Sequence, residues 1–413
     1  MRNWCLSTTL IALGLAIAPA AFGGEDDLIA SLGERELARR ALTLDTSYQA
    51  LANDPAVDVV DVVRARPGLL RKETASFALP LAPGLGLRAY QTDAYDTAGD
   101  MLVWSGVLVS DLIADVGTAA QTFDPTNSVT MVRNGDKLTG TVHWQGETFQ
   151  LRPLKTGDHA LVALDSKLMP PDHPAEYSKL KTVPMAGGDP NSRVDTVIRV
   201  LVNYTSSAAS ASGDINGLIT LAVAETNQGY TNSGVLIDLI LAGSGQVTYT
   251  QSSSFSTDLS RYRGTTDGFM DSIHTTRNSV AADVAVLLIN NSSSCGLASG
   301  IGSTAATAFA VAHWSCATGY YSFGHEIGHL QSARHDPSTD GTNTPYAYGH
   351  GYRYTGNPSW RTIMAYDCPA GCPRLNYWSN PAKLYNGVAM GTTTRSDNTR
   401  VLNTTRTTVA AFR

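Results

Sequence analysis

The segment HEIGHLQSARHD, residues 325–336, constrains this chain more than any other feature of its sequence. Residues four positions apart lie on one face of an α-helix, so His325 and His329 can direct their imidazoles at one point. His335 follows six residues later and would lie roughly 9 Å further along a continued helix. We therefore expect the helix to end near Gln331 and the chain to fold back, so that three imidazoles converge.

Three neutral imidazoles with an open fourth position are typical of a catalytic zinc site rather than a structural one. Zinc lowers the pKa of a bound water to about 7, and a nearby carboxylate can then take its proton. Glu326 is rotated by about 100° from His325 on a helix, which places it near the metal without directing it there as a ligand. The alternative is a set of polar histidines on a surface helix. The rarity of histidine, 9 among 413 residues, disfavours it.

The segment resembles the extended zinc motif of the metzincin metalloproteases, HExxHxxGxxH. That family also has a downstream turn containing methionine, and TIMAY at 362–366 resembles it. The resemblance implies a metzincin-like α/β domain with a mixed twisted sheet, a zinc helix and this Met-turn. It implies that Met364 lies beneath one catalytic Zn²⁺ as a hydrophobic floor. It also implies that Tyr366 lies near the zinc, where it would stabilise the oxyanion.

The longer strings HEIGHLQSARHDP and TIMAYDCPAGCPRLNYWSNP, 362–381, are most similar to the bacterial peptidyl-Asp metalloendopeptidases, which cut before aspartate. The resemblance covers roughly residues 195–413. A pocket for a carboxylate needs a partner such as arginine, which binds carboxylates in two-pronged fashion. Arg374 is the first basic residue after the Met-turn, and Arg353 and Lys383 are lesser candidates. The alternative for Arg374 is an ordinary surface arginine.

Residue 332 departs from the zinc motif, because the family glycine is replaced by Ser332. That glycine ends the helix in a left-handed conformation, which other residues adopt at a cost of about 1–2 kcal/mol. Two alternatives follow: Ser332 accepts this strain, or the turn differs slightly. The expected ligands and the base are all present, so the departure concerns local stability more than activity.

The first residues, MRNWCLSTTLIALGLAIAPAAFG, have the composition of a secretory signal peptide. The apolar run is too short to span a membrane, and we expect cleavage after Ala20 or Gly23. No later segment is apolar enough for a span, so the mature protein is expected to be secreted. The net charge is −6 and no basic patch suggests nucleic acid binding.

Four cysteines remain once Cys5 has left with the signal peptide. An even number in an exported chain suggests two disulfides, and four cysteines allow three pairings. Sequence neighbours favour Cys295–Cys316 and Cys368–Cys372. A four-cysteine metal site is the alternative, but the spacing lacks C-x₂-C pairs.

Residues 24–190 are expected to form a propeptide, with a helical part over residues 25–65 and antiparallel strands over 85–165. The strand prediction is based on alternating apolar residues and on Asn-Gly and Gln-Gly turns. A permanent β-rich accessory domain is the alternative. Residues 167–195, rich in proline, glycine and charge, are predicted to be a linker.

The protease domain is expected over 191–413. VIRVLVNYT (197–205), VLIDLILAG (235–243) and ADVAVLLIN (282–290) are predicted strands, and residues 215–234 a helix. Strands that alternate with helices indicate an α/β sheet built by crossovers.

A propeptide without cysteine between residues 24 and 294 cannot block zinc with a thiolate. A carboxylate, a histidine or steric cover must do so, and Asp172 and His173 are candidates for a direct ligand. An enzyme that cuts before aspartate could process itself at Asp189 or Asp195.

We therefore predict a secreted zinc endopeptidase made as a zymogen, acting on proteins or peptides on the amino side of aspartate, or also of glutamate. Its own propeptide would be its intramolecular inhibitor. The alternatives are a metzincin of broad or different specificity and an adhesion module with an inactive zinc site. The adhesion module is disfavoured because Glu326 is present.

Overall fold

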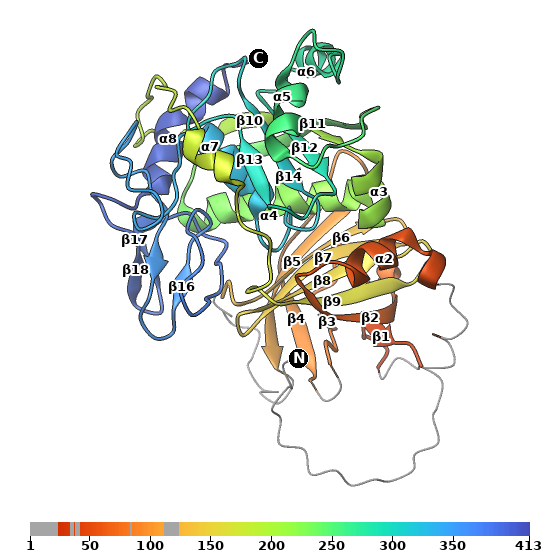
Figure 1. Cartoon of the computed structure of the whole chain (residues 1–413). Helices are drawn as coiled ribbons and strands as arrows, with labels where there is room; N and C mark the ends of the chain where they lie inside the picture. Colours follow the sequence, from red (N-terminus) through yellow and green to blue (C-terminus); the bar gives the residue numbers. More distant parts are fainter. Residues whose placement is uncertain (1–23, 34–36, 38–41, 83–84, 111–123) are drawn as a thin grey trace.

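Two large sheets organise the molecule, one from each half of the chain (Figure 1). The computed structural model describes residues 24–413 except 34–36, 38–41, 83–84 and 111–123. The expected signal peptide, residues 1–23, therefore lies outside the described part of the chain. Within the described part, none of the helices combines the length and the apolar character needed to span a bilayer.

The N-terminal half forms a nine-stranded antiparallel sheet in the order β1-β2-β9-β8-β7-β6-β5-β4-β3. Two-residue turns join β6 to β7 and β7 to β8, with Asn134 opposite Lys137 and Trp144 opposite Glu147. The antiparallel strands predicted over 85–165 are present. The strands are β1 (Ile29–Ser31), β2 (Val57–Ala65), β3 (Ser76–Ala78), β4 (Leu87–Asp96), β5 (Leu102–Ser110), β6 (Asn127–Asn134), β7 (Lys137–Trp144), β8 (Glu147–Pro153) and β9 (His159–Leu164).

The helical prediction for residues 25–65 is wrong over much of this range. The described residues hold one α-helix there, α2 (Thr46–Ala52), and a 3₁₀ turn, Leu42–Leu44. Residues 57–65 form β2, which pairs with β9. The sequence VDVVDVVRA is rich in valine, whose branched side chain favours strands, so the neighbouring strand overrides the helical spacing of the charges.

The C-terminal half contains a five-stranded sheet in the order β11-β10-β12-β14-β13. Its first four strands are parallel, and β13 pairs antiparallel with β14 at the edge. The predicted alternation of strands and helices is confirmed. The elements are β10 (Thr196–Tyr204), α3 (Ser206–Ser212), α4 (Ile215–Ser233), β11 (Ile237–Gln246), α5 (Phe255–Arg263), α6 (Ile273–Ser279), β12 (Val284–Ile289), β13 (Gly296–Ala298), β14 (Phe309–His313) and α7 (Ser322–Leu330).

The chain after α7 is mostly irregular and surrounds the end of that helix. It contains two small antiparallel pairs and a final helix that packs near β10. These elements are β15 (Arg353–Tyr354), β16 (Trp360–Arg361), β17 (Asn380–Tyr385), β18 (Val388–Met390) and α8 (Asn398–Val409).

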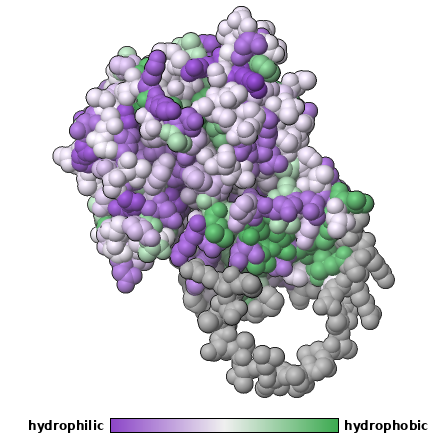
Figure 2. Space-filling view, viewed as in Figure 1, coloured by the Kyte–Doolittle hydropathy of each residue, from purple (hydrophilic) through white to green (hydrophobic). Residues whose placement is uncertain are grey.

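Helix α4 lies between the two sheets (Figure 1). Leu221 and Ala224 of this helix pack against Val103 and Val132 of the N-terminal sheet. A larger apolar cluster contains side chains of both halves, such as Val162 and Leu218. The two halves therefore share a core. In the view of Figure 2, hydrophobic surface gathers over the N-terminal half and the C-terminal half is mostly hydrophilic.

Residues 165–195 join β9 to β10 and include the predicted linker, residues 167–195, but they are not a free linker. This connecting segment runs along the C-terminal half, where Thr182 forms a parallel bridge with Ile301. Further on, the Gly188 N–H donates to the Thr404 carbonyl at 2.7 Å. The segment contains a 3₁₀ turn, η4 (Ala175–Lys179). Its first part passes directly over the end of α7, which makes it part of the site described next.

Candidate metal centre and active site

Helix α7 carries His325 and His329, and every residue of this helix is buried. It packs against β13, β14 and α4. The rings of the two histidines lie with their centroids 4.7 Å apart, as expected for positions separated by one turn. The helix thus presents two imidazoles on one face, inside a closely packed environment.

The chain folds back directly after α7. The Ser332 N–H donates to the His329 carbonyl and the Ala333 N–H to the Gly328 carbonyl, each at 2.9 Å. This is the Schellman arrangement, which requires a left-handed residue after the helix cap. Ser332 is that residue, with φ of 76°, so the serine adopts the left-handed conformation expected of the family glycine. The reversal brings His335 back to the other two histidines.

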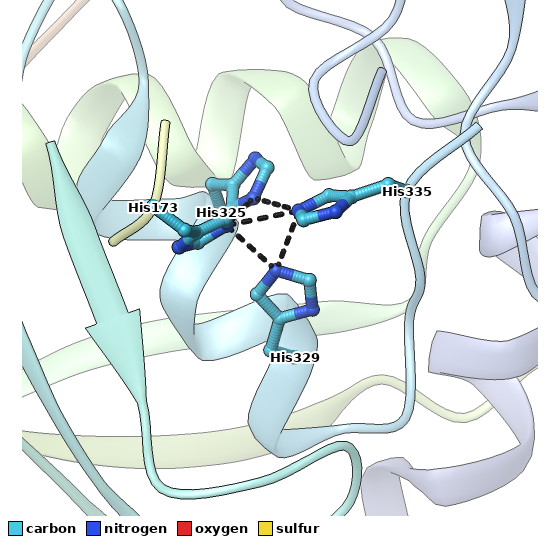
Figure 3. Close-up of side chains that lie close together, drawn as sticks. All are labelled: His173, His325, His329 and His335. Atoms are coloured by element: carbon cyan, nitrogen blue, oxygen red, sulfur yellow. Dashed lines mark hydrogen bonds between the residues drawn. The ribbon is translucent and has the colours of Figure 1, made fainter. Parts of the chain in front are cut away.

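Four histidines, not three, meet at this point (Figure 3). The fourth is His173 of the connecting segment. Its Nε2 lies 3.0 Å from Nε2 of His325, 3.1 Å from that of His329 and 2.9 Å from that of His335. The Nε2 of His335 lies 3.2 Å from that of His325 and 3.1 Å from that of His329. All four side chains are buried.

The hydrogen bonds of the outer ring nitrogens fix the tautomer of three of the four histidines, while Nδ1 of His335 has no partner among the described residues. Nδ1 of His325 lies 2.9 Å from the Ile363 carbonyl, and Nδ1 of His329 lies 2.8 Å from the Ala333 carbonyl. A carbonyl only accepts, so each Nδ1 carries the proton and each Nε2 presents a lone pair. His173 is fixed in the same way by the Gly296 carbonyl, at 2.9 Å.

Converging lone pairs in a buried site call for a cation between them. Tetrahedral zinc with Zn–N distances of about 2.0–2.1 Å separates its ligand nitrogens by about 3.4 Å, close to the spacing of this cluster. Burial, together with the neighbouring histidines, lowers the pKa of His325, His329 and His335, so the three rings are neutral, as metal ligands must be. The residues present therefore fit a zinc ion held by imidazole nitrogens.

Glu326 lies beside this cluster under the edge strand β13. A Cβ atom added to Gly296 would lie 2.2 Å from Glu326 Oε1, so the strand approaches the carboxylate as closely as a glycine allows. Neither carboxylate oxygen has a hydrogen-bond partner among the described residues. Burial raises the pKa of Glu326 well above its usual range, and the carboxylate of Asp172 adds to this effect. A buried carboxyl group with a raised pKa is suited to take and return a proton.

The two residues expected from the TIMAY string lie close to the residues that carry the cluster. Met364 is fully buried, and its sulfur packs next to Gly328 of α7. The Ala365 N–H donates to the Thr362 carbonyl at 3.0 Å, which closes a turn around this methionine. The ring of Tyr366 lies with its centroid 4.5 Å from that of His335.

Arg374 meets a carboxylate immediately beside the cluster. Its Nη2 lies 2.8 Å from Oδ1 and 2.7 Å from Oδ2 of Asp172, the residue before His173. The same guanidinium donates to the carbonyls of Tyr320 and Ala365 and lies over the Tyr320 ring. Burial alone would raise the pKa of Asp172, but Arg374 and Arg361 outweigh it and hold this pKa well below its usual range.

Arg361 and Tyr177 belong to the site but were missed in the sequence. Nη1 of Arg361 lies 3.8 Å from Asp172 Oδ2, and the Tyr177 ring stacks on that of His173 with centroids 4.7 Å apart. Arg361 directly precedes the TIMAY string, and this position beside the Met-turn was the one sequence feature that could have marked it as a site residue. Nothing in the sequence near Tyr177 marks it.

The other residues weighed in the sequence lie elsewhere or have structural contacts. Arg353 forms an ion pair with Asp336, at 3.2 Å, and Lys383 is half-buried on β17. Neither meets Asp172. Two further histidines, His313 and His350, lie outside the zinc-motif segment and are buried. His313 ends the central strand β14, and the Nδ1 of His350 bonds to the His335 carbonyl.

Both expected disulfides are present and border the site. Cys295–Cys316 links the start of β13 to the loop that leads towards α7, and Cys368–Cys372 closes a small loop after Tyr366. Cys372 is separated from Arg374 by a single residue, so this loop restrains the chain that carries the arginine.

Comparisons with known proteins agree with this geometry. Residues 194–379 match the model of the metallopeptidase family M12. A peptidyl-Asp metalloendopeptidase of Xanthomonas campestris is 48% identical over 422 residues, covering 100% of this chain and 99% of its own. A protein of the same name from Pseudomonas fragi is 50% identical over 190 residues, which are 46% of this chain and 100% of its own.

Among solved structures, metalloproteinase-II of Bacteroides fragilis is similar at 10% identity with a TM-score of 0.39, over 63% of this chain and 81% of its own. That likeness is too distant to carry an argument about the fold. The relative from Xanthomonas campestris matches the chain from end to end. The chain therefore belongs to the peptidyl-Asp metalloendopeptidase family and is a zinc metalloendopeptidase.

Proposed function

We propose that this chain is a secreted endopeptidase, made as a zymogen, that cuts peptide bonds on the amino side of aspartate. One observation carries the specificity: beside the metal cluster, the buried Arg374 binds the carboxylate of an aspartate, Asp172, at 2.7 and 2.8 Å. The names of the relatives support the same reading.

His325, His329 and His335, whose Nε2 atoms converge, would hold the metal. Bound zinc would polarise the scissile carbonyl and make a water molecule acidic enough to be deprotonated near neutral pH. Glu326 takes the proton of this water and later returns it to the leaving amine. The phenol of Tyr366 donates a hydrogen bond to the developing oxyanion.

Two features keep this machinery in place. Met364 packs beneath α7 and supports the helix that carries two ligands. The carbonyls of Ile363 and Ala333 accept from Nδ1 of His325 and His329, which orients both rings.

The pocket at Arg374 has the chemistry that a carboxylate requires. A charge removed from water is costly unless it is paired and hydrogen-bonded. Arg374 supplies both, and Arg361 adds a second positive charge 3.8 Å from Asp172. A substrate aspartate after the scissile bond would take the place of the Asp172 carboxylate, whereas an apolar residue would leave Arg374 without its carboxylate partner.

The same contacts support a zymogen. Residues 24–190 act as a pro-region, because their connecting segment occupies the metal cluster and the arginine pocket at once. Residues 1–23 act as the signal peptide for export. Two disulfides are consistent with an oxidising destination.

Arg374→Ala tests the specificity. In the processed enzyme it is expected to cost about 2–4 kcal/mol in kcat/KM on a peptide with aspartate after the scissile bond, because the buried charge pair is lost. On a matched peptide with an apolar residue at that position, the loss should be much smaller. Equal losses on both peptides would remove Arg374 from this role.

Arg353→Ala is the matched control. This arginine is also basic and lies near the site, but its guanidinium contacts Asp336 and the Asp367 carbonyl rather than Asp172. Its replacement should leave the ratio between the two peptides unchanged. Thermal melting of both variants shows whether either change acts through the fold.

A further inference from the structure

We propose that Asp172 and His173 form a two-residue plug in which the His173 imidazole is the fourth metal ligand and the Asp172 carboxylate fills the specificity pocket. This plug keeps the unprocessed chain inactive. The inference rests on the proposed function, because it takes Arg374 to be the anchor of a substrate aspartate.

His173 has the position, the tautomer and the support of a metal ligand. Its Nε2 lies 2.9–3.1 Å from the three other Nε2 atoms. Its Nδ1 donates to the Gly296 carbonyl at 2.9 Å, so the lone pair of Nε2 faces the cluster. The Tyr177 ring stacks on the outer face of the His173 ring. The Tyr177 hydroxyl donates to Asp340 at 3.2 Å, which holds the Tyr177 ring in place.

The imidazole also occupies the space that the reaction needs. Nδ1 of His173 lies 3.5 Å from Oε1 of Glu326. The ring thus stands between the proposed base and the open coordination position, where the attacking water would have to lie. Since three imidazoles leave a single position open in a tetrahedral site, a fourth imidazole excludes that water.

Asp172 holds the plug from the second side. Its carboxylate is paired with Arg374 at 2.7 Å and is buried, as is its partner. Charge-assisted hydrogen bonds of this kind are about twice as strong as neutral ones. The plug therefore uses the same recognition as a substrate, although it is not cut.

The direction of the chain explains why the plug is not cut. The Cys295 and Gly296 N–H groups donate to the carbonyls of Pro171 and Asp172. This order, and the parallel bridge between Thr182 and Ile301, show that the segment runs parallel to residues 295–301. Along the plug the pocket residue comes first and the metal residue second. A substrate cut before aspartate presents the scissile carbonyl first and the aspartate second, so it must run the opposite way.

A cysteine at position 173 tests the ligand directly. The unprocessed chain, kept intact by Glu326→Gln, is loaded with Co²⁺ in place of zinc. His173→Cys should give an intense thiolate-to-cobalt absorption band, because a thiolate would then bind the metal. Ser178→Cys, at an exposed position of the same segment, should give none. Absence of the band in a folded His173→Cys chain, together with unchanged zinc release in His173→Ala, overturns the ligand assignment.

Release of zinc to a chelator tests both halves of the plug. In the same intact chain, His173→Ala should release zinc at least about tenfold faster, and low concentrations of free imidazole should slow this release again. The tenfold expectation is the lower end of the loss seen when even an outer partner of a ligand is removed. Asp172→Asn keeps all four histidines and should also speed release, while the exposed Lys179→Ala should not. If the Asp172→Asn chain releases zinc at the unchanged rate, the proposed role of the Asp172 carboxylate in the plug is overturned.

The absorption band and the release of zinc are measured without catalysis. They therefore test the plug independently of the proposed preference for aspartate. If the matched peptides exclude Arg374 but the thiolate band appears, the proposed aspartate preference fails and the ligand stands. If the processed enzyme cuts before aspartate but neither the band nor the faster release is seen, the plug alone fails.

Discussion

Ser332 turns the chain between the second and third histidines in a backbone conformation that favours glycine. With φ of 76°, it adopts the left-handed region at a cost of about 1–2 kcal/mol. Ser332→Gly is therefore expected to raise the free energy of unfolding by about 1 kcal/mol. Thermal or denaturant melting of the intact chain measures this change.

Ser332→Ala separates the backbone from the side chain. The serine hydroxyl contacts the Met185 sulfur at 3.3 Å, and both substitutions remove this contact. Only glycine relieves the left-handed conformation. Alanine should thus be no more stable than serine, and a glycine variant that is no more stable than the alanine variant would contradict the strain.

Glu326 is the second residue whose replacement is informative. Glu326→Gln is expected to keep the fold and the metal but to lower turnover at least about 10²-fold, the low end for a general base. The measurement uses chains processed by an unrelated protease. Glu225→Gln is the control, because Glu225 is the other glutamate of the C-terminal half and accepts the Gly319 N–H away from the cluster. Near-normal turnover in Glu326→Gln would rule out this mechanism.

At this scale the convergence of His325, His329 and His335 was predictable from the sequence, and the reason is local. The spacing of three histidines and one glutamate on a helix and its reversal is a short-range pattern, and the left-handed Ser332 follows from the same pattern. His173 was one candidate among two, because its approach to α7 spans 152 residues. Arg361 was missed, since a long-range contact with Asp172 leaves no periodic signal.

At the scale of elements, the edge strand β13 decides how closely the backbone can approach Glu326. A side chain at position 296 would overlap Oε1, Cδ and Cγ of this glutamate, at 2.2, 2.6 and 2.7 Å. Gly296→Ala is thus expected to destabilise the intact chain by about 1–3 kcal/mol, as overpacking does. It should also lower the turnover of the processed enzyme, because the base must move.

Gly341→Ala is the control for this change, since nothing lies within 4 Å of the added atom. Melting of the two variants side by side gives the comparison. Equal stability would mean that β13 or Glu326 moves aside without cost.

Helices and strands were predictable where a local sequence pattern, such as an apolar run or a turn dipeptide, decides the structure. The parallel strands β10, β11 and β12 are short apolar runs, and the hairpins of the N-terminal sheet carry their turn residues. Strand β2 was not predicted, because its pairing with β9 lies about 100 residues away. The connecting segment was expected to be a linker, because its proline and glycine content hides the contacts it makes.

At the scale of the whole molecule, the occupied site determines how the chain can process itself. The cluster holds His173 of its own chain, so Asp189 and Asp195, both exposed, must be cut by another molecule. We expect mature termini near 189–195. The rate of processing should rise with protein concentration, since the first cut is intermolecular.

Mixing experiments check this expectation. The Glu326→Gln chain made alone should stay long, and a small amount of processed wild-type enzyme should shorten it at the same sites, as mass spectrometry of the products can show. Processing of the mutant alone, or a rate independent of concentration, would point to a different protease or to a cut within one molecule.

The parallel run of the connecting segment beside β13 has one consequence for when activity appears. While the chain is intact, the blocking residues are tethered, so their effective concentration at the site is in the millimolar range expected of a short linker. Once the tether is cut, the pro-region becomes an ordinary binding partner held by its own affinity, and dilution can then remove it. The cleaved protease would thus remain inhibited by its pro-region at high protein concentration and become active after dilution.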